Sequence, residues 1–351
     1  ADLISRPQTN IHSLFNYVPR GTFSKFNIDN EAEFASPLKP ILKENIEYSD
    51  LISYASRQEL DDKFSEKSAI SYEDAATILM FNTDYPIAKL DSSEVNARIA
   101  DNVEICPGAY IAENVEIGEG SWIGPNAVIF DYVKIGKNCK VFPGAVVGAI
   151  PQDLKFENEV SYVEIGDNTT IRECATINRG TAASGKGITK VGNNVLLMSY
   201  THVAHDCELK DNVIFTSYTG VAGETQVDEW AILGGGTMAH QFSHIGAHAM
   251  VGGGSLIHKD VPPYILAGRE PLVYAGVNIV GLKRRGFSSE QVETIKDIYK
   301  VIYFDKLNRS DACDKVEQIF PQSIERDTIL NFIRGSKRGV IKAMTIDASA
   351  E

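Results

Sequence analysis

Aliphatic residues recur at every sixth position through the centre of this chain. The series runs through Ile99, Ile105, Ile111, Ile117, Ile123, Ile129, Ile135, Val141 and Val147, returns at Ile165, Ile171 and Ile177, and resumes at Val191, Leu197, Val203, Leu209, Phe215, Val221, Val227, Leu233, Ala239, Ile245, Val251 and Ile257. A period of six matches neither the 3.6 of a helix nor the 2 of an ordinary strand. It is typical of a solenoid in which each repeat buries its apolar face against its neighbours.

Three hexads, about 18 residues, make one triangular coil with a short parallel strand on each side and the aliphatic residue pointing inward. We therefore predict a β-class fold, a left-handed parallel β-helix (hexapeptide-repeat solenoid) of roughly nine coils over residues 94–264. Residues 1–93 lack the hexad and are predicted to form an N-terminal extension, partly helical after a cap at Ser71 and Asp74, that covers the open end of the solenoid.

Residues 265–351 carry a helical pattern and are predicted to form a C-terminal α-helical domain. Ser288 and Gln291 form a capping box ahead of a helix with Val292, Ile295, Ile298, Tyr299 and Ile302 on one face. Further helices are expected at about 310–320 and 324–334, the last ending at Gly335.

The hexad is interrupted twice. Between Val147 and Ile165 the phase is kept, yet Asp153 and Glu159 occupy the periodic positions, so we expect one coil to leave the core there. Between Ile177 and Val191 the phase is lost over the glycine-rich stretch 180–187, which predicts a protruding loop. Extended loops on a solenoid are favoured places for binding chemistry.

Charge and composition exclude several classes of protein. A formal net charge of -13 argues against general nucleic-acid binding, which needs a basic face. No apolar run approaches the ~18 residues that a membrane span requires. The five cysteines include no CxxC pair, which favours reduced thiols. Residues 1–27 hold one acidic residue, Asp2, and resemble what remains near a transit peptide. We expect a soluble protein, cytoplasmic if bacterial, or in a mitochondrial or other organelle matrix if eukaryotic.

The densest reactive cluster is the segment His202-Val203-Ala204-His205-Asp206-Cys207. Val203 belongs to the inward series, so the flanking His202 and His205 can point outward. An outward imidazole is a suitable general base, and a neighbouring carboxylate can orient it. One coil beyond His205 stands Gly223, whose exposed N–H could stabilise an oxyanion, and two coils beyond stands Gln241.

Two other clusters have alternative interpretations. His240, His244 and His248 raise the possibility of a zinc site shared between subunits, but their register on the coils is wrong, and no metal site is predicted. Lys283, Arg284 and Arg285 form a basic cluster that suits a nucleotide diphosphate or an acidic carrier protein, or is simply a solvated run of charge.

Between about residues 95 and 342 the sequence resembles the UDP-N-acetylglucosamine O-acyltransferases. The matching strings are Pro151-Gln152-Asp153-Leu154-Lys155, Ile171-Arg172-Glu173, Asn178-Arg179-Gly180-Thr181, Leu196-Leu197-Met198, His202 through Cys207, His240-Gln241-Phe242, Asp260-Val261-Pro262-Pro263-Tyr264, Gly276-Val277-Asn278-Ile279 and Gly281 through Phe287. The hexad alone marks a large superfamily, whereas the strings around His205 and Arg284, in this order, are specific.

The resemblance implies a reaction. A hydroxyacyl chain would move from acyl carrier protein to the 3-hydroxyl of UDP-N-acetylglucosamine, the first step of lipid A synthesis. His205 would be the general base, with Asp206 supporting it and the Gly223 N–H stabilising the oxyanion. No cofactor would be bound, because phosphopantetheine enters on the carrier protein.

The resemblance also assigns binding residues and an assembly. Gln152, Asp153 and Lys155 would hold the sugar and phosphate, and His202, His240 and Gln241 would line the cleft. Asn278, Arg284 and Arg285 would bind the nucleotide, and Gly253 would form the floor of the acyl pocket. The sites of that family lie between the subunits of a homotrimer.

Three positions depart from the family pattern: Glu224, Pro271 and Val280. With the long extension, they motivate a second hypothesis, an acyltransferase-like structural subunit of a larger, mitochondrial assembly that binds other proteins through residues 1–93. A third hypothesis is an acyltransferase that uses coenzyme A and another sugar or amine.

Overall fold

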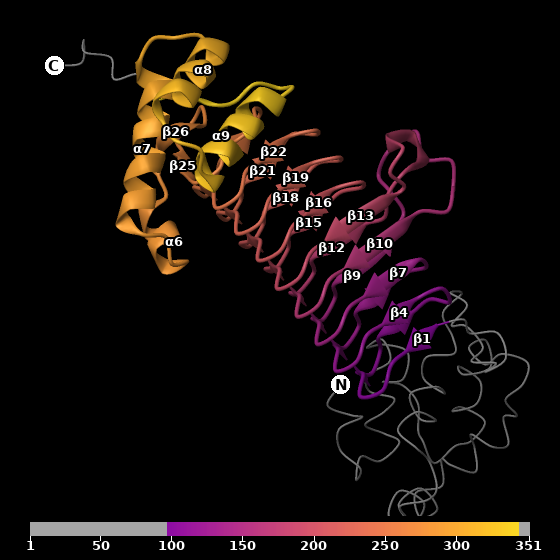
Figure 1. Cartoon of the computed structure of the whole chain (residues 1–351). Coiled ribbons are helices and arrows are strands. Elements are labelled where there is room, and N and C mark those ends of the chain that lie inside the picture. The colour runs from indigo at the N-terminus through magenta and orange to yellow at the C-terminus, as the bar shows by residue number, and fades with distance from the viewer. Residues whose placement is uncertain (1–96, 344–351) are drawn as a thin grey trace, which may run out of the picture. The chain divides into compact units, whose positions relative to one another are not determined.

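The computed structural model describes residues 97–343, in which the chain winds into a parallel β-helix followed by four helices (Figure 1). The predictions for residues 1–93, including the helix after Ser71, lie outside the described residues. Three sheets form the sides of the helix, and each strand pairs in parallel with the strand one coil away.

Sheet A contains β1 (Arg98–Ile99), β4 (Glu116–Ile117), β7 (Val133–Ile135), β10 (Tyr162–Ile165), β13 (Ile188–Val191), β16 (Glu208–Leu209), β19 (Gln226–Val227) and β22 (His244–Ile245). Sheet B contains β2 (Glu104–Ile105), β5 (Trp122–Ile123), β8 (Lys140–Val141), β11 (Thr170–Ile171), β14 (Leu196–Leu197), β17 (Ile214–Phe215), β20 (Ile232–Leu233) and β23 (Met250–Val251), continued by β25 (Ile265–Gly268), β26 (Val273–Val277) and β27 (Lys342–Ala343). Sheet C contains β3 (Tyr110–Ile111), β6 (Val128–Ile129), β9 (Val146–Ala149), β12 (Thr176–Asn178), β15 (His202–Val203), β18 (Gly220–Val221), β21 (Met238–Ala239) and β24 (Leu256–Ile257).

The hexad residues form the core of the prism, as the periodicity predicts. From Ile117 to Ile257 they are buried, with Phe215, Leu197 and Leu233 among the largest side chains that are fully enclosed. Ile99 and Ile105 of the first described coil stay 39% and 44% exposed, because no described coil lies beneath them. The core is therefore a stack of aliphatic layers in which each coil covers the next.

The chain turns three times per coil, and the turns define corners AB, BC and CA, named by the sheets that they connect. One residue of most turns takes a left-handed backbone, among them Asn212, Tyr218 and Asp206, with φ of 61°, 64° and 60°. Asparagine and aspartate tolerate this conformation better than other non-glycine residues do, which fits their frequency at the corners.

Both interruptions of the hexad lie at corner CA. Residues 150–161, between β9 and β10, form the first corner loop, and residues 179–187, between β12 and β13, form the second (Figure 1). The prediction that a whole coil leaves the core at the first interruption is wrong. Because β10 pairs directly with β7, Ile165 opposite Ile135, the sheets are continuous and only the corner is enlarged.

The C-terminal helices follow a hairpin of β25 (Ile265–Gly268) and β26 (Val273–Val277). They are α6 (Ile279–Arg284), α7 (Ser289–Phe304), α8 (Arg309–Ile319) and α9 (Ile324–Gly335), and β27 (Lys342–Ala343) then pairs with β26. The predicted capping box of Ser288 and Gln291 is present at α7. The Tyr299 hydroxyl donates to the Pro263 carbonyl at 2.6 Å, which ties α7 to the end of the solenoid.

Candidate active site

Corner CA brings the reactive residues of successive coils into one column. The first corner loop carries Gln152, Asp153 and Lys155, and the turn after β15 carries His205. The next two turns of the same corner carry Gly223 and Gln241, as the 18-residue coil predicts. The parallel register therefore aligns groups that are far apart in the sequence.

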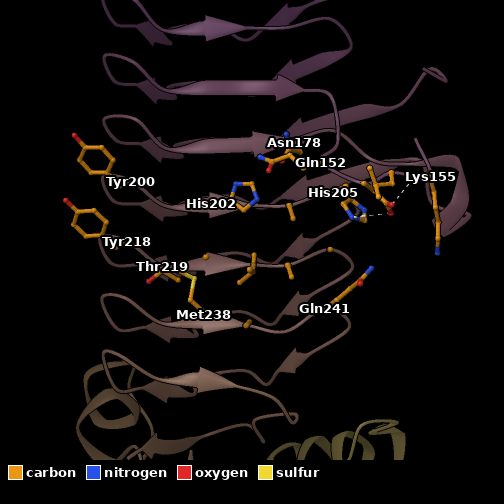
Figure 2. Close-up of a pocket in the computed structure, with 18 residues that line it drawn as sticks. Gln152, Lys155, Asn178, Tyr200, His202, His205, Tyr218, Thr219, Met238 and Gln241 are labelled. Carbon is orange, nitrogen blue, oxygen red and sulfur yellow. Dashed lines mark hydrogen bonds and ion pairs between the residues drawn. The ribbon is translucent and has the colours of Figure 1, made fainter. Parts of the chain in front are cut away.

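A cavity of about 820 Å³ opens beside this column. Seven of the predicted site residues line it: Gln152, Asp153, Lys155, His202, His205, Gly223 and Gln241. Figure 2 shows His205 facing the first corner loop, with His202 between it and the pair Tyr200 and Tyr218 on the far side of the cavity.

His205 and Asp206 form a hydrogen-bonded pair at the edge of the cavity. The imidazole Nδ1 lies 2.8 Å from Asp206 Oδ2, and Nε2 lies 3.8 Å from Asp153 Oδ2. Since an ionised carboxylate only accepts, Nδ1 carries the hydrogen and Nε2 keeps its lone pair in the neutral ring. The imidazole is 12% exposed, on the cavity side, so its basic nitrogen can meet a substrate hydroxyl.

Asp206 is fully enclosed, yet its carboxylate is well supplied with donors. Thr181 donates from its backbone N–H and from its hydroxyl, the latter at 2.7 Å, and the Ser184 hydroxyl lies 2.7 Å from Oδ1. Burial alone would raise the pKa of Asp206, but the hydrogen bonds from His205, Ser184 and Thr181 outweigh it and lower the pKa. Asp206 is therefore an anion at neutral pH.

The two histidines of the cluster are shifted in opposite directions. The hydrogen bond to Asp206, opposed by burial and aided by the charges of Asp206, Asp153 and Glu224, raises the pKa of His205. Burial, with the neighbouring His205, lowers the pKa of His202, whose Nδ1 lies 2.7 Å from the Thr176 hydroxyl. His202 is thus a neutral polar group, and His205 is the stronger base.

Gly223 is required by its contact with His205. A Cβ built at this position would run into the imidazole ring, so any other residue would displace the ring. No acceptor among residues 97–343 takes the Gly223 N–H, whereas the following N–H, of Glu224, donates to the His205 carbonyl at 3.0 Å. The predicted oxyanion donor is therefore available beside the base.

Several cavity residues were not identified as site residues from the sequence. Asn178 is one; it stands inside a string that supports the family resemblance, and its Nδ2 donates to the Ile150 carbonyl at 2.9 Å. Tyr200 and Tyr218 stack at 5.1 Å, and Met238 lies one strand beyond Gly220. For Met238 the available signal was its position two coils beyond His202, and for the two tyrosines it was their spacing of one coil from each other.

Three predicted nucleotide residues do not line this cavity. Asn278 caps α6, accepting from the Gly281 N–H at 3.2 Å and donating to the His248 carbonyl at 3.0 Å. Arg284 is exposed on the last turn of α6. The Arg285 guanidinium lies 5.2 Å from the Trp230 ring. Burial, aided by the charge of Arg285, lowers the pKa of His248 to about 4.

His240 and Gly253 also lie outside the lining. The His240 ring is exposed beside Gln241, with Nδ1 3.1 Å from the Gln241 carbonyl. Gly253 sits at corner BC, where a Cβ would come within 3.0 Å of the Gly235 carbonyl. Of the departures from the family pattern, Glu224 stands at corner CA beside Gly223, and Val280 is 61% exposed on α6.

The described residues 97–343 hold no group of three or more His, Cys, Asp or Glu side chains placed to bind a metal ion. His244 instead pairs with Asp228 at 2.8 Å, and His248 packs between Trp230 and Tyr264. Within the same part of the chain, no helix combines the length and apolarity that crossing a membrane requires.

Comparison with protein families gives two kinds of match. Residues 260–341 match the family described as UDP-N-acetylglucosamine O-acyltransferase, domain 2. Residues 96–131, 114–149 and 188–223 match the bacterial transferase hexapeptide repeat.

Individual relatives and structures agree with these families. The chain is 55% identical over 197 residues to the acyl-[acyl-carrier-protein]–UDP-N-acetylglucosamine O-acyltransferase of Sulfurihydrogenibium sp., covering 56% of this chain and 72% of that protein. It is 58% identical over 197 residues to the enzyme of the same name from Chlorobaculum parvum, covering 56% and 74%.

Two solved structures are similar along nearly their full length. The UDP-N-acetylglucosamine acyltransferase of Francisella novicida superimposes with a TM-score of 0.69 at 36% identity, covering 73% of this chain and 96% of that one. LpxA of Bacteroides fragilis gives 0.61 at 49% identity, covering 69% and 99%. The left-handed parallel β-helix with C-terminal helices is therefore the fold of this chain, as predicted.

Proposed function

The chain belongs to the family of UDP-N-acetylglucosamine O-acyltransferases, and from this premise we propose how its own residues carry out the reaction. The reaction transfers an acyl group from acyl carrier protein to UDP-N-acetylglucosamine, the entry step of lipid A synthesis. The observation that carries the proposal is the His205–Asp206 pair, at 2.8 Å, with its free Nε2 beside the cavity and the Gly223 N–H one coil away.

In the proposed mechanism His205 Nε2 removes the proton from the sugar 3-hydroxyl as its oxygen attacks the thioester carbonyl. Asp206 stabilises the imidazolium that forms. The Gly223 N–H donates to the oxyanion of the tetrahedral intermediate. Collapse of the intermediate breaks the carbon–sulfur bond, and the departing phosphopantetheine thiolate takes the proton from His205, which restores the base.

The first corner loop suits the sugar nucleotide. Lys155 offers a cation for phosphate, and Asp153 and Gln152 offer an acceptor and an amide for sugar hydroxyls. His202, held by Thr176, and Gln241 complete the polar wall, with exposed His240 next to it.

The direct test is acyl transfer by the purified full chain from acylated carrier protein to UDP-N-acetylglucosamine, followed by mass spectrometry. His205→Ala should lower kcat by roughly a thousandfold, the range expected for loss of a general base. His258→Ala, an exposed histidine outside the cavity, is the matched control and should keep full activity. Turnover by His205→Ala close to that of the control would exclude His205 as the base.

The donor distinguishes the hypotheses. Glu224 puts a negative charge where the family pattern has a histidine, so acyl-coenzyme A should be run beside acyl carrier protein in the same assay. Preference for coenzyme A would favour the third hypothesis. The structural-subunit hypothesis has no support in the comparisons, and the extension on which it depends lies outside the described residues.

We further propose that the site is completed by a second subunit of a homotrimer. Asn278, Arg284 and Arg285 suit a nucleotide but do not line the cavity of their own chain, so a neighbouring chain would supply them. Gly253, at another corner, would form the floor of the acyl pocket in the same assembly.

Mixed trimers test this arrangement. His205→Ala and Arg285→Ala subunits, each inactive alone, should regain activity when unfolded and reassembled together, because about a quarter of randomly formed interfaces then pair an intact His205 with an intact Arg285. No recovery, with trimers shown to have formed, would place both residues in a site within one chain.

A further inference from the structure

The second corner loop, residues 179–187, has no place in the mechanism so far. None of its residues lines the cavity, and yet it encloses the carboxylate that orients the base. Apart from His205, the side-chain and backbone donors to the Asp206 carboxylate among residues 97–343 come from this loop.

The loop has the conformation that this contact needs. Thr181 caps the short 3₁₀ turn η1 (Ala182–Ser184), accepting from the Ser184 N–H at 3.3 Å, and Gly185 closes the turn with φ of 74°. The Thr181 and Ser184 hydroxyls consequently face the two carboxylate oxygens, each at 2.7 Å. A Cβ at Gly180 would collide with Ile188 and Asp206, so glycine permits the close approach.

The other side of the loop is tied to the first corner loop. The Ala182 N–H donates to Glu159 Oε1 at 2.7 Å, and the Arg179 guanidinium lies 5.8 Å from the Phe156 ring. Asp153, on that same first loop, reaches within 3.8 Å of His205 Nε2. His205 Nδ1 therefore faces Asp206, which the second loop holds, and Nε2 faces Asp153 on the first loop, to which the second loop is bonded.

We propose that Thr181 and Ser184 are positioning residues of the acyl transfer, which act through Asp206 and touch neither substrate. Three donors from one loop prevent the carboxylate from rotating away from His205 Nδ1, and they keep it charged inside the protein. This inference rests on the proposed function, because it assigns the two hydroxyls a part in the same reaction.

The proposal predicts a change in the pH dependence of the rate. The active form has an ionised Asp206 and a neutral His205, and each hydroxyl stabilises the ionised carboxylate. Without one of them, the carboxylate is held less firmly against Nδ1 and raises the pKa of His205 less, so the acid limb of the kcat profile, which follows His205, moves to lower pH. A residue with a purely structural role would lower stability and leave the limb in place.

The experiment compares Ser184→Ala and Thr181→Val with the unsubstituted full chain in the acyl-transfer assay, across the acid limb. We expect kcat to fall roughly tenfold and the limb to move down by roughly half a pH unit or more, with the KM for UDP-N-acetylglucosamine changed less than about twofold. Thr181→Ser keeps the hydroxyl and should keep the limb of the unsubstituted chain.

Thr169→Val is the matched control, since Thr169 is an equally buried threonine at corner AB whose hydroxyl donates to the Gly192 carbonyl at 2.8 Å. An unmoved limb in both variants, or an equal movement in Thr169→Val or Thr181→Ser, would overturn the proposal. If Thr181→Val does not fold, Ser184→Ala decides the matter alone. If the unsubstituted chain is active, His205→Ala is inactive and the limb of Ser184→Ala does not move, this inference is wrong and the proposed function stands. If the unsubstituted chain shows no acyl transfer, both are wrong.

Discussion

Corner CA and corner AB are built from the same turn but have different tasks. Corner AB repeats its short turn from coil to coil, with left-handed residues such as Asn194, Asn212 and Trp230 in one column. Corner CA is enlarged in two successive coils and then returns to the short turn at His205. His205, the proposed base, thus sits on the first regular turn after the two loops.

The difference separates the source of stability from the source of chemistry. Buried aliphatic residues occur on all three sheets of the solenoid, whereas both enlarged loops lie at corner CA. The regular repeat of strands and short turns, here called the frame, places Gly223 and Gln241 above His205. The first corner loop adds Asp153 and Lys155 to the cavity, and the second brings two hydroxyls to Asp206. Changes at corner CA should alter activity, and changes in the frame should alter stability.

The largest effect is expected at Gly223. Gly223→Ala inserts a methyl group into the space of the His205 ring and should lower kcat by roughly a thousandfold, combining loss of the base with a disturbed oxyanion site. Gly268→Ala, where a Cβ meets no atom within 4 Å, should retain activity. Acyl-transfer rates with circular dichroism as a folding check measure both, and an active Gly223→Ala enzyme would contradict the geometry of the column.

The next effect concerns Asp206. Asp206→Asn keeps the shape but removes the charge that raises the pKa of His205, so the acid limb of kcat/KM should move to lower pH while kcat falls roughly a hundredfold. In the unsubstituted enzyme that limb should lie above pH 6.5, the ordinary value for histidine. A limb that stays in place after the substitution would show that another group controls it.

The same pair predicts how stability depends on pH. A raised pKa of His205 contributes stability that is complete below the unfolded value of 6.5 and is lost as pH rises through the folded value. The difference in Tm between the unsubstituted chain and Asp206→Asn should therefore be larger at about pH 6 than at about pH 9. Equal differences at both values would mean that the hydrogen bond does not favour the imidazolium.

A frame residue should show the opposite pattern. Leu197→Ala opens a cavity in a fully enclosed layer and should lower the free energy of unfolding by about 2–5 kcal/mol. Leu154→Ala on the first corner loop removes a fully exposed side chain and should cost less than about 0.5 kcal/mol. Denaturant titration monitored by circular dichroism compares them, and similar losses would undo the division between frame and corner.

The smallest effect is expected on the outer face of sheet A. Lys134 Nζ lies 3.9 Å from Glu116 Oε2, and both side chains are exposed, so solvent screens the pair. Lys134→Met should leave both Tm and turnover unchanged. A measurable loss of Tm or of turnover would show that this exposed ion pair contributes to stability or to activity, contrary to the prediction.

The sequence was most informative where the hexad holds. The coil length alone places Gly223 and Gln241 over His205, because parallel register repeats every 18 residues. It was least informative where the phase is broken: nothing in the spacing indicates that Thr181 and Ser184 turn back onto Asp206, since a loop outside the repeat has no register to follow. At the first corner loop the gap of 18 residues from Val147 to Ile165 equals one coil in length, and the enlarged corner was therefore mistaken for a departed coil.

The C-terminal residues show a different limit. The resemblance grouped Asn278 and Arg285 with His205, but in one chain they contact the end of the solenoid, at His248 and Trp230. A site divided between copies of a chain leaves no trace in the spacing of one copy, because the distance that matters crosses between molecules. Their joint role with His205 is therefore a proposal that rests on the resemblance and not on spacing.

The left-handed backbone at Asp206, with φ of 60°, has a consequence for design. Neighbouring residues of an extended strand point to opposite faces, but this turn lets two consecutive side chains, His205 and Asp206, meet in a hydrogen bond. The turn by itself brings the two side chains of the proposed catalytic pair within reach of each other, and the second corner loop then holds the carboxylate in place. A parallel β-helix with a left-handed corner, and a neighbouring loop that brings two hydroxyls to it, offers a place to transplant that pair.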